Sequence, residues 1–274
     1  MSKRKEIFIP KMSEKMAYLH GFMATDGYVC KSGISISLQE KDKELVYNLS
    51  DWFSSIGWNP KINYREIKEK SYIRMRVHSR DLCEYFIDSG IFQNKSFNIE
   101  FNKNIPKNFI RHYIRGIFDG DGCLHHRRKN LEISFCSASK SFIEVLTNII
   151  EKELKIKKKN IYTRKKSQKH NFIYEIRYYS RESLKLLSWI YKEPFSFFLK
   201  RKFDIWDNFS PVYKHYWDKK DFVFLNENIN LSNFELASKL RRSENSIRKK
   251  KWEIEKGKTN LKKFYDKEYY KSVV

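Results

Sequence analysis

A nine-residue segment that occurs twice sets the strongest constraint on how this chain folds. Residues 19–27 read LHGFMATDG and residues 114–122 read IRGIFDGDG, so the copies lie 95 positions apart. Each copy is an apolar, helix-like run that ends in an aspartate followed by a glycine. The repeat therefore predicts two related halves, with Asp26 and Asp121 at equivalent ends of two helices.

The duplication extends beyond this motif. Each copy is followed by an alternating strand pattern, a helical pattern, and a further strand that leads into a helix. The matching segments are 34–39 with 131–136, 43–49 with 140–146, and 76–81 with 177–182. Ser79 and Ser180 are the expected N-caps of the last helices. Each half thus reads helix, strand, strand, helix, strand, strand, helix, which predicts an α+β fold with helices on one face of an antiparallel sheet.

We expect three domains. Residues 1–108 and 109–210 form the two halves, and residues 211–274 form a separate helical module. Gly27 and Gly122 stand where a left-handed cap would end each motif helix.

Two mid-helix glycines predict how the halves meet. Gly21 and Gly116 occupy equivalent positions, although glycine costs about 1 kcal/mol relative to alanine inside a helix. A close approach of the two motif helices explains that cost and brings Asp26 and Asp121 together. Two carboxylates at helix C-termini need a cation, and Mg²⁺ takes such oxygen ligands. Asp119 is two residues from Asp121, so we expect only one of them to face the partner helix.

The two segments resemble the LAGLIDADG motifs of homing endonucleases, in the single-chain form with two motifs. The resemblance covers about residues 10–205 and implies two pseudo-symmetric halves with saddle-shaped sheets that lie along the DNA major groove. It also implies that Asp26 and Asp121 hold the catalytic metal, Mg²⁺ with Mn²⁺ as a substitute. The backbone carbonyls of Thr25 and Gly120 are further candidate metal ligands.

Several positions depart from that motif. The second motif position, often small in the family, is His20 in one copy and Arg115 in the other. Gln39 resembles a polar residue that supports the active site, whereas its counterpart is Cys136, which suggests unequal cutting of the two strands. Lys41 is the candidate for an assisting lysine.

The charge of the chain favours a polyanion as partner. The net charge is +23. The many Lys, Asn, Ile, Phe and Tyr residues are expected from an AT-rich gene, but that coding bias does not by itself make basic residues outnumber acidic ones. Alternation places polar and basic side chains on the open face of both sheets, which indicates a surface for double-stranded DNA. The candidate contacts are Ser35, Ser37, Lys61, Arg74 and Arg76 in the first half, and Arg127, Arg128, Arg164, Lys165, Lys166 and Arg177 in the second.

The C-terminal region predicts three short helices, over residues 221–225, 231–240 and 241–252. Ser232 and Glu235 form a capping box for the second. The arrangement resembles a Myb-like helix-turn-helix, in which the basic third helix enters the major groove. Ile247 and Trp252 would then be core, and the residues facing DNA would be Ser243, Asn245, Ser246, Arg248 and Lys249.

These features together predict a monomeric, metal-dependent endonuclease that cuts both strands of a long DNA site. Two alternatives remain open: a non-catalytic DNA-binding transcription regulator, and an RNA maturase that acts on intron RNA with the same scaffold. The four cysteines include no CxxC pair and fit no common zinc pattern. The chain shows no membrane-spanning run or signal peptide, so we expect a cytoplasmic, nucleoid-associated protein.

Overall fold

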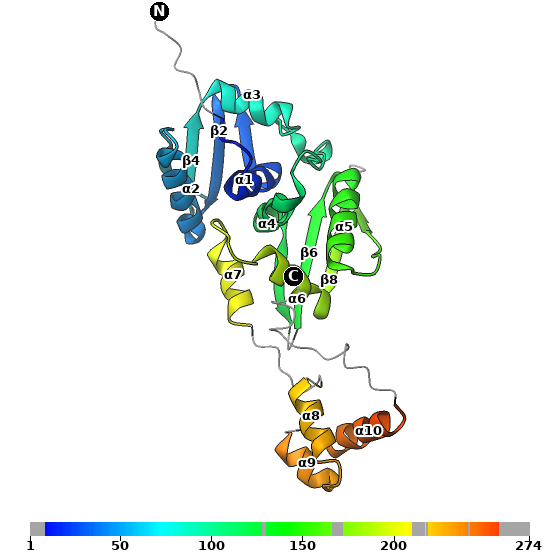
Figure 1. Cartoon of the computed structure of the whole chain (residues 1–274). Helices are drawn as coiled ribbons and strands as arrows, with labels where there is room; N and C mark the ends of the chain where they lie inside the picture. The colour runs from blue at the N-terminus through cyan, green and yellow to red at the C-terminus, as the bar shows by residue number, and fades with distance from the viewer. Residues whose placement is uncertain are drawn as a thin grey trace, which may run out of the picture. The chain divides into compact units, whose positions relative to one another are not determined.

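Two copies of the same supersecondary unit follow one another along the chain (Figure 1). The computed structural model describes residues 9–127, 130–165, 172–209, 217, 219–240 and 242–257. The chain divides into two compact units, residues 1–209 and 210–274. The first unit holds both copies, and the second is helical where it is described.

The first copy contains three α-helices and four strands in the expected order. Its elements are α1 (Glu14–Thr25), β1 (Gly27–Cys30), β2 (Gly33–Gln39), the 3-10 helix η1 (Glu40–Asp42), α2 (Lys43–Ser55), β3 (Lys61–Ile67), β4 (Lys70–His78) and α3 (Arg80–Asp88). Two 3-10 helices, η2 (Lys95–Phe97) and η3 (Lys107–Phe109), lie in the connection to the second copy.

The second copy repeats this order and adds one helix. Its elements are α4 (Ile110–Asp121), β5 (Cys123–Arg127), β6 (Asn130–Ser137), α5 (Lys140–Leu154), β7 (Tyr162–Lys165), β8 (Phe172–Tyr179), α6 (Arg181–Ile190) and α7 (Lys200–Asp207). The strand orders are β1-β2-β4-β3 and β5-β6-β8-β7, with antiparallel pairing in both sheets. The predicted α+β fold is therefore confirmed.

Alternation along the strands explains why each sheet buries one face. In β2, Ile34, Ile36 and Leu38 are buried and pair with buried residues of β4. In β6, Leu131 and Ile133 are buried in the same way. Successive strand side chains point to opposite faces, so the intervening polar residues lie on the outer face. The helices of each copy cover the inner, apolar face (Figure 1).

The predicted left-handed caps at the motif helices are wrong. Gly122 has φ −72°, and Gly27 begins β1 directly after the Asp26 cap. Glycine is needed there for space, because a Cβ on Gly27 would lie 2.5 Å from the Cα of Met23, and one on Gly122 would lie 2.5 Å from the carbonyl oxygen of Phe118. The chain turns from helix into strand too tightly for a side chain.

The expected serine caps differ between the halves. The Ser79 hydroxyl accepts a hydrogen bond from the Leu82 amide at 3.0 Å, as predicted. Ser180 stands before α6 with φ +50° and makes no capping hydrogen bond through its side chain. Its backbone amide donates instead to the carbonyl of Leu131 at 3.0 Å, which extends the sheet rather than the helix.

The segment from Lys192 to Phe209, which we call the strap, returns from the second half to contact both motif helices and the first half. Arg115 of α4 donates from Nε to the Phe197 carbonyl at 2.8 Å, and the Phe197 ring packs beside Trp52 of α2. Arg201 binds Asp42 through Nε at 3.0 Å. The strap therefore fastens the two halves together, a role that the repeat did not predict because the strap has no counterpart in the first copy.

The C-terminal unit is built around a small apolar core. It comprises α8 (Lys219–Glu227), α9 (Asn233–Lys239) and α10 (Glu244–Glu255), and the predicted capping box of Ser232 and Glu235 is present. Ile247 is buried with Leu225 and Leu236, as expected. Trp252 is 47% exposed, so its assignment to the core is wrong.

None of the helices in the described residues has the length and apolar character needed to cross a bilayer.

Candidate functional site

Two glycines set the distance between the motif helices. An ideal Cβ on Gly21 of α1 would lie 2.0 Å from the carbonyl oxygen of Tyr113 in α4. The reciprocal Cβ on Gly116 would lie 2.1 Å from the carbonyl oxygen of Tyr18. Since neither position can hold any side chain, the helix backbones touch directly. This confirms the close approach predicted from the sequence.

The close approach brings the two aspartates to one end of the helix pair. Asp26 caps α1, where its amide donates to the Phe22 carbonyl at 3.0 Å, and Asp121 is the last residue of α4. Gly120 and Thr25 meet just before them, because a Cβ on Gly120 would lie 1.9 Å from the Thr25 hydroxyl oxygen. Both acids are exposed.

The acids influence each other electrostatically. The pKa of Asp121 is raised to about 6, first by desolvation and then by the negative charge of Asp26. The pKa of Asp26 is also raised, chiefly by desolvation. Solvent reaches both carboxylates, yet enough protein surrounds them to disfavour the ionised form. A pair of like charges in such a setting attracts a cation.

Two lysines lie beside the acids, one at each motif helix. Lys95 of η2 donates to the carbonyl oxygen of Gly27 at 2.6 Å, directly after α1. Lys202 of the strap is buried and donates to the carbonyls of Asp119 at 2.9 Å and Gly122 at 2.6 Å, at the end of α4. Desolvation lowers the pKa of Lys202 to about 8. The positive charges of both lysines lower the pKa of Asp121 in turn.

Sequence reasoning missed both lysines. Neither is part of the repeated motif, and Lys202 lies on the unrepeated strap. The local signal was weak in each case, because the chain is rich in lysine throughout.

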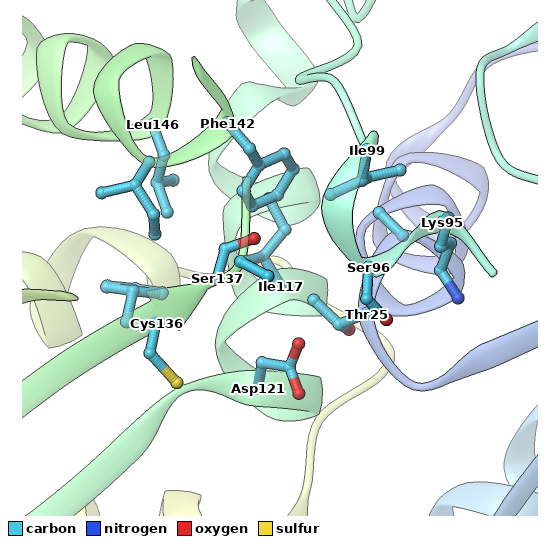
Figure 2. Close-up of a pocket in the computed structure, with 14 residues that line it drawn as sticks. Thr25, Lys95, Ser96, Ile99, Ile117, Asp121, Cys136, Ser137, Phe142 and Leu146 are labelled. Atoms are coloured by element: carbon cyan, nitrogen blue, oxygen red, sulfur yellow. The ribbon is translucent and has the colours of Figure 1, made fainter. Parts of the chain in front are cut away.

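A small pocket with a cavity volume of about 70 Å³ opens beside Asp121 (Figure 2). Asp121 lies between Cys136 of β6 on one side and Thr25 and Ser96 on the other, and Phe142 and Leu146 of α5 form the inner wall. The pocket thus combines one carboxylate and several hydroxyl groups with an apolar inner wall.

The other predicted active-site residues occupy different surroundings. Gln39 ends β2 and is half-buried opposite Tyr72, whereas Cys136 lies in the pocket beside Asp121. Burial, followed by the charge of Asp121, raises the pKa of the Cys136 thiol. Lys41 is exposed in η1. The roles of Gln39 and Lys41 remain predictions.

Asp119 corrects one expectation. It is fully buried, and its Oδ2 accepts hydrogen bonds from the Tyr18 hydroxyl of α1 and from the Leu199 amide, both at 2.9 Å. It therefore faces the partner helix as Asp121 does, but deeper in the interface. Two residues of one helix can both reach α1 because Tyr18 is long enough to meet Asp119 from the side.

The two residues that depart from the second motif position are both buried, His20 in the core of its own half and Arg115 against the strap and Tyr18 of α1. His20 is fully buried and its Nε2 lies 3.0 Å from the Tyr85 hydroxyl, and desolvation lowers its pKa to about 4. Arg115 is fully buried too, and its guanidinium carbon lies 5.1 Å from the Phe195 ring centre.

The outer face of the first sheet is a cluster of cations. Register places Arg76 between Ser35 and Lys61, and Arg74 between Ser37 and Asn63. Desolvation, followed by the charges of Arg65 and Arg76, lowers the pKa of Arg74. Ser35 is only 6% exposed, so the prediction that its side chain is open for DNA contact is wrong. In register it lies between two larger residues, Tyr28 and Arg76.

The predicted cations of the second sheet are arranged differently. Arg127 ends β5, and Arg164 and Arg177 lie on β7 and β8; each makes an ion pair with a buried glutamate. Lys165 lies in β7 on the opposite side from Arg164, because strand side chains alternate. Arg128 and Lys166 lie outside the described residues.

The donor set at the two acids fits a hard divalent cation. Mg²⁺ binds through one or two carboxylates and keeps several waters, which matches two exposed aspartates beside helix-end carbonyls. Lys202 occupies the carbonyls of Phe118, Asp119 and Gly122, which do not include that of Gly120. Among the described residues, no three or more His, Cys, Asp or Glu side chains gather as a closed metal cage would require.

The predicted DNA contacts of the C-terminal unit lie at the start of α10. Asn245, Arg248 and Lys249 are exposed along one helix face, and exposed Trp252 continues that face by its spacing. Ser243 is the N-cap and accepts a hydrogen bond from the amide of half-buried Ser246 at 3.3 Å. Whether these residues read DNA remains a prediction.

Comparison with known proteins identifies the family. A model described as "LAGLIDADG-like domain" matches residues 13–88 and 108–188, which together make up more than half of the chain. The chain belongs to the LAGLIDADG-like domain family. The matched segments are the two copies described above.

Two curated relatives from Methanocaldococcus jannaschii share part of this sequence. The chain is 26% identical over 167 residues to DNA-directed RNA polymerase subunit Rpo1C, which covers 60% of this chain and 18% of that protein. It is 24% identical over 141 residues to ATP-dependent DNA helicase Hel308, with 48% and 11% covered. The chain spans less than a fifth of either relative, so their activities do not transfer to it.

Several solved structures have a similar fold. Full-length DUF199/WhiA from Thermatoga maritima matches with a TM-score of 0.47 and 16% identity over 94% of this chain and 95% of that one. The homing endonuclease I-WcaI bound to its DNA recognition sequence matches at 0.43 and 16%, over 66% and 82%. I-DmoI in complex with DNA and Mn matches at 0.43 and 17%, over 66% and 98%. These similarities are too distant to transfer an activity or a residue's role.

Proposed function

We propose that this protein is a metal-dependent endonuclease that cuts double-stranded DNA at a long, pseudo-symmetric site. The observation that carries the proposal is the pair of Asp26 and Asp121. Two equivalent helices, in contact at glycines, present these carboxylates at one place, where the charge of Asp26 raises the pKa of Asp121. An acid pair with this arrangement has no evident structural use, because both side chains are exposed.

The chemistry divides between the metal and the chain. A divalent cation such as Mg²⁺, or Mn²⁺ in its place, would supply an activated water and stabilise charge on the phosphate. Asp26 and Asp121 would hold it through oxygen atoms, with the carbonyls of Thr25 and Gly120 as further ligands. Lys95 contributes a positive charge that faces the same site and acts on both acids. That charge would favour the approach of a phosphate.

The partner in this proposal is duplex DNA that runs along the outer faces of both sheets. The cations of the first sheet, together with the net charge of +23, favour a polyanion. Each half would contact about half of the site, and a single chain would suffice because it carries both halves. The α10 face of the C-terminal unit would extend the contact into a neighbouring major groove. RNA binding by the same faces is the maturase alternative.

One observation favours a second function, that of a non-catalytic DNA-binding regulator. Lys95 and Lys202 already place two positive charges close to the acids. The acid pair is therefore partly neutralised by the protein itself, so it can persist without a metal. A regulator of this kind would bind DNA with the same faces and cut nothing.

A two-stage assay separates these functions. Duplexes bound by the full chain are first enriched from a randomised 40-bp pool, and the enriched duplexes are then incubated with the protein and Mg²⁺, Mn²⁺ or EDTA. We expect cleavage with either metal, and loss of cleavage with retained binding in Asp26→Asn and Asp121→Asn. Asp51→Asn, at an exposed position of α2, is the matched control and should cut normally.

The outcomes are distinct. Cleavage by both aspartate variants would refute the metal site. Binding by the wild-type protein without any cleavage would support the regulator. Binding to structured intron RNA with stimulated splicing, and no DNA cleavage, would support the maturase.

A further inference from the structure

The outer face of the second sheet carries a continuous row of arginine and glutamate side chains, which we call the charge ladder. It consists of Arg127, Glu132, Arg177, Glu175 and Arg164. The successive ion pairs measure 3.1, 3.7, 3.0 and 3.5 Å between nitrogen and oxygen. The ladder therefore runs across four strands without a break.

The strand register shows that both glutamates belong to the outer face. Glu132 of β6 lies opposite Tyr179, and Glu175 of β8 lies opposite Cys136, on the side away from the buried Ile133 and Ile176. The two acids are only 5% and 6% exposed. Since both lie on the outer face, the arginines above them provide the cover.

The first sheet has no such acids. The described strands of that sheet place five basic side chains and no acidic side chain on the outer face by alternation, namely Lys61, Arg65, Lys70, Arg74 and Arg76. The described strands of the second sheet place three arginines and two glutamates there. The halves are thus equivalent in fold and unequal in surface charge.

An acid on a DNA-facing surface weakens phosphate binding, so its presence requires another role. Arg177 donates from Nε and Nη2 to the two carboxylate oxygens of Glu175, both at 3.0 Å, which fixes the plane of its guanidinium. Its Nη1 lies 3.7 Å from Glu132. Glu175 uses the edge formed by Nε and Nη2, and the Tyr179 hydroxyl also hydrogen-bonds to Arg177. At most two of the five guanidinium N–H groups, both on Nη atoms, are therefore left for a base, and the side chain remains 34% exposed. A rigid arginine fork is the side chain that pairs with O6 and N7 of guanine.

We propose that the charge ladder is the base-reading surface of this protein, in which Glu132 and Glu175 hold Arg177 in a fixed orientation for guanine and keep the ladder arginines from binding phosphate without sequence preference. In this arrangement the second half discriminates sequence, and the cation cluster of the first half contributes mainly affinity. The inference rests on the proposed function, because it requires duplex DNA on the outer faces.

The ladder also indicates which base pairs are read. Glu175 pairs in register with Cys136, and Cys136 lines the pocket beside Asp121. Glu175 is therefore the ladder residue whose strand neighbour lies beside Asp121. The guanine should lie close to the cleavage position in one half-site, rather than at the outer edge.

The test compares DNA preference and salt dependence across matched variants of the full chain. Each variant is incubated with a randomised 40-bp duplex pool, and bound duplexes are sequenced. Affinity for the unselected pool is measured between 50 and 200 mM KCl. The variants are Glu175→Gln, Arg177→Lys and, as control, Glu144→Gln. Glu144 makes a surface pair with Lys140 on α5, so its substitution makes the same charge change on the helical face.

We expect the wild-type protein to enrich a guanine near the centre of one half-site. Glu175→Gln should bind the unselected pool more tightly, with a salt slope steeper by about 0.9 for one added phosphate contact. It should lose about 5- to 150-fold of its preference at that guanine, the range for a good bidentate base contact. Arg177→Lys should lose the preference as well, because lysine has no fork, while binding the unselected pool nearly as the wild type does. Glu144→Gln should match the wild type.

Two results would overturn the inference, and they differ in what they leave standing. If the wild type enriches a motif and Glu175→Gln and Arg177→Lys keep the same preferences, the ladder does not read bases, while DNA recognition stands. If the wild type enriches no sequence at all, the proposed function fails and the inference fails with it. Arg177→Lys keeps the charge and gives an independent reading should Glu175→Gln fold poorly.

Discussion

The contact at Gly21 allows the helix interface to be tested by adding one methyl group. Alanine in place of glycine is worth about 1 kcal/mol of added stability inside an isolated helix. At this position, however, the Cβ of Gly21→Ala would lie 2.0 Å from the Tyr113 carbonyl oxygen and 2.9 Å from the Ile117 amide nitrogen. Both obstacles are backbone atoms, so no side-chain rotation relieves them.

The size of the effect follows from these distances. Ordinary contact begins near 3.4 Å, so α1 and α4 must separate by about 1.4 Å at this point. Overpacking of this kind costs about 3 kcal/mol at the upper end of its usual range. Offset by the helical gain of about 1 kcal/mol, the net change is a loss of about 2 kcal/mol of unfolding free energy. Asp26 and Asp121 would move apart with the helices.

Urea unfolding of the full chain, followed by circular dichroism, measures this change. Gly57→Ala is a suitable control, because Gly57 has φ +91° and open space around it. It should lose about 1 kcal/mol for backbone conformation and leave DNA cleavage intact. Gly21→Ala should lose both stability and cleavage. A stability gain of about 1 kcal/mol in Gly21→Ala would refute the packing argument, because that is the result of helix propensity alone.

Four further predictions follow from the site and the C-terminal unit. In Asp26→Asn, a carboxyl NMR titration should find the pKa of Asp121 below about 6 but still raised, because desolvation remains; an unchanged value would mean that the acids do not interact. Because folding raises the pKa of Asp121, its ionisation opposes folding as pH rises through about 6, so Asp121→Asn should raise the melting temperature more at pH 7.5 than at pH 4.5. Lys202→Met should lower the unfolding free energy by about 2 kcal/mol or more, because buried carbonyls lose their donor, and a neutral result in urea unfolding would contradict that role. Joint replacement of Arg248 and Lys249 by glutamine should reduce the salt slope of DNA binding by up to about 1.8, and an unchanged slope would place α10 away from DNA.

The repeated motif and the apolar alternation in the sequence were sufficient to predict the architecture of the first unit. Strand alternation and the repeated motif specify local periodicity, and each half must bury its apolar positions to fold. The mid-helix glycines were informative for the same reason: a residue that weakens a helix needs a packing explanation, and the contacts at Gly21 and Gly116 supply one.

The predictions that failed concern how far the neighbouring residues bury a side chain. Strand alternation places Ser35 on the outer face of its sheet, yet it is only 6% exposed and lies between the larger residues Tyr28 and Arg76. Trp252 has the large apolar side chain of a core residue, yet it is 47% exposed, and the core of the small unit is formed by other residues. Neither outcome is encoded locally, because burial depends on the size of neighbours that are distant in sequence.

The sequence by itself determined the duplicated α+β halves, the meeting of the motif helices and the equivalence of Asp26 and Asp121, since these follow from a repeat and from periodicity. Only the tertiary structure decided which cations act on that pair and which arginines are already paired. Lys202 reaches the end of α4 from the unrepeated strap, and Glu132 and Glu175 meet Arg177 across neighbouring strands. Charge interactions depend on distance in space rather than in sequence, so a count of lysines and arginines gives the class of partner and the fold gives their arrangement.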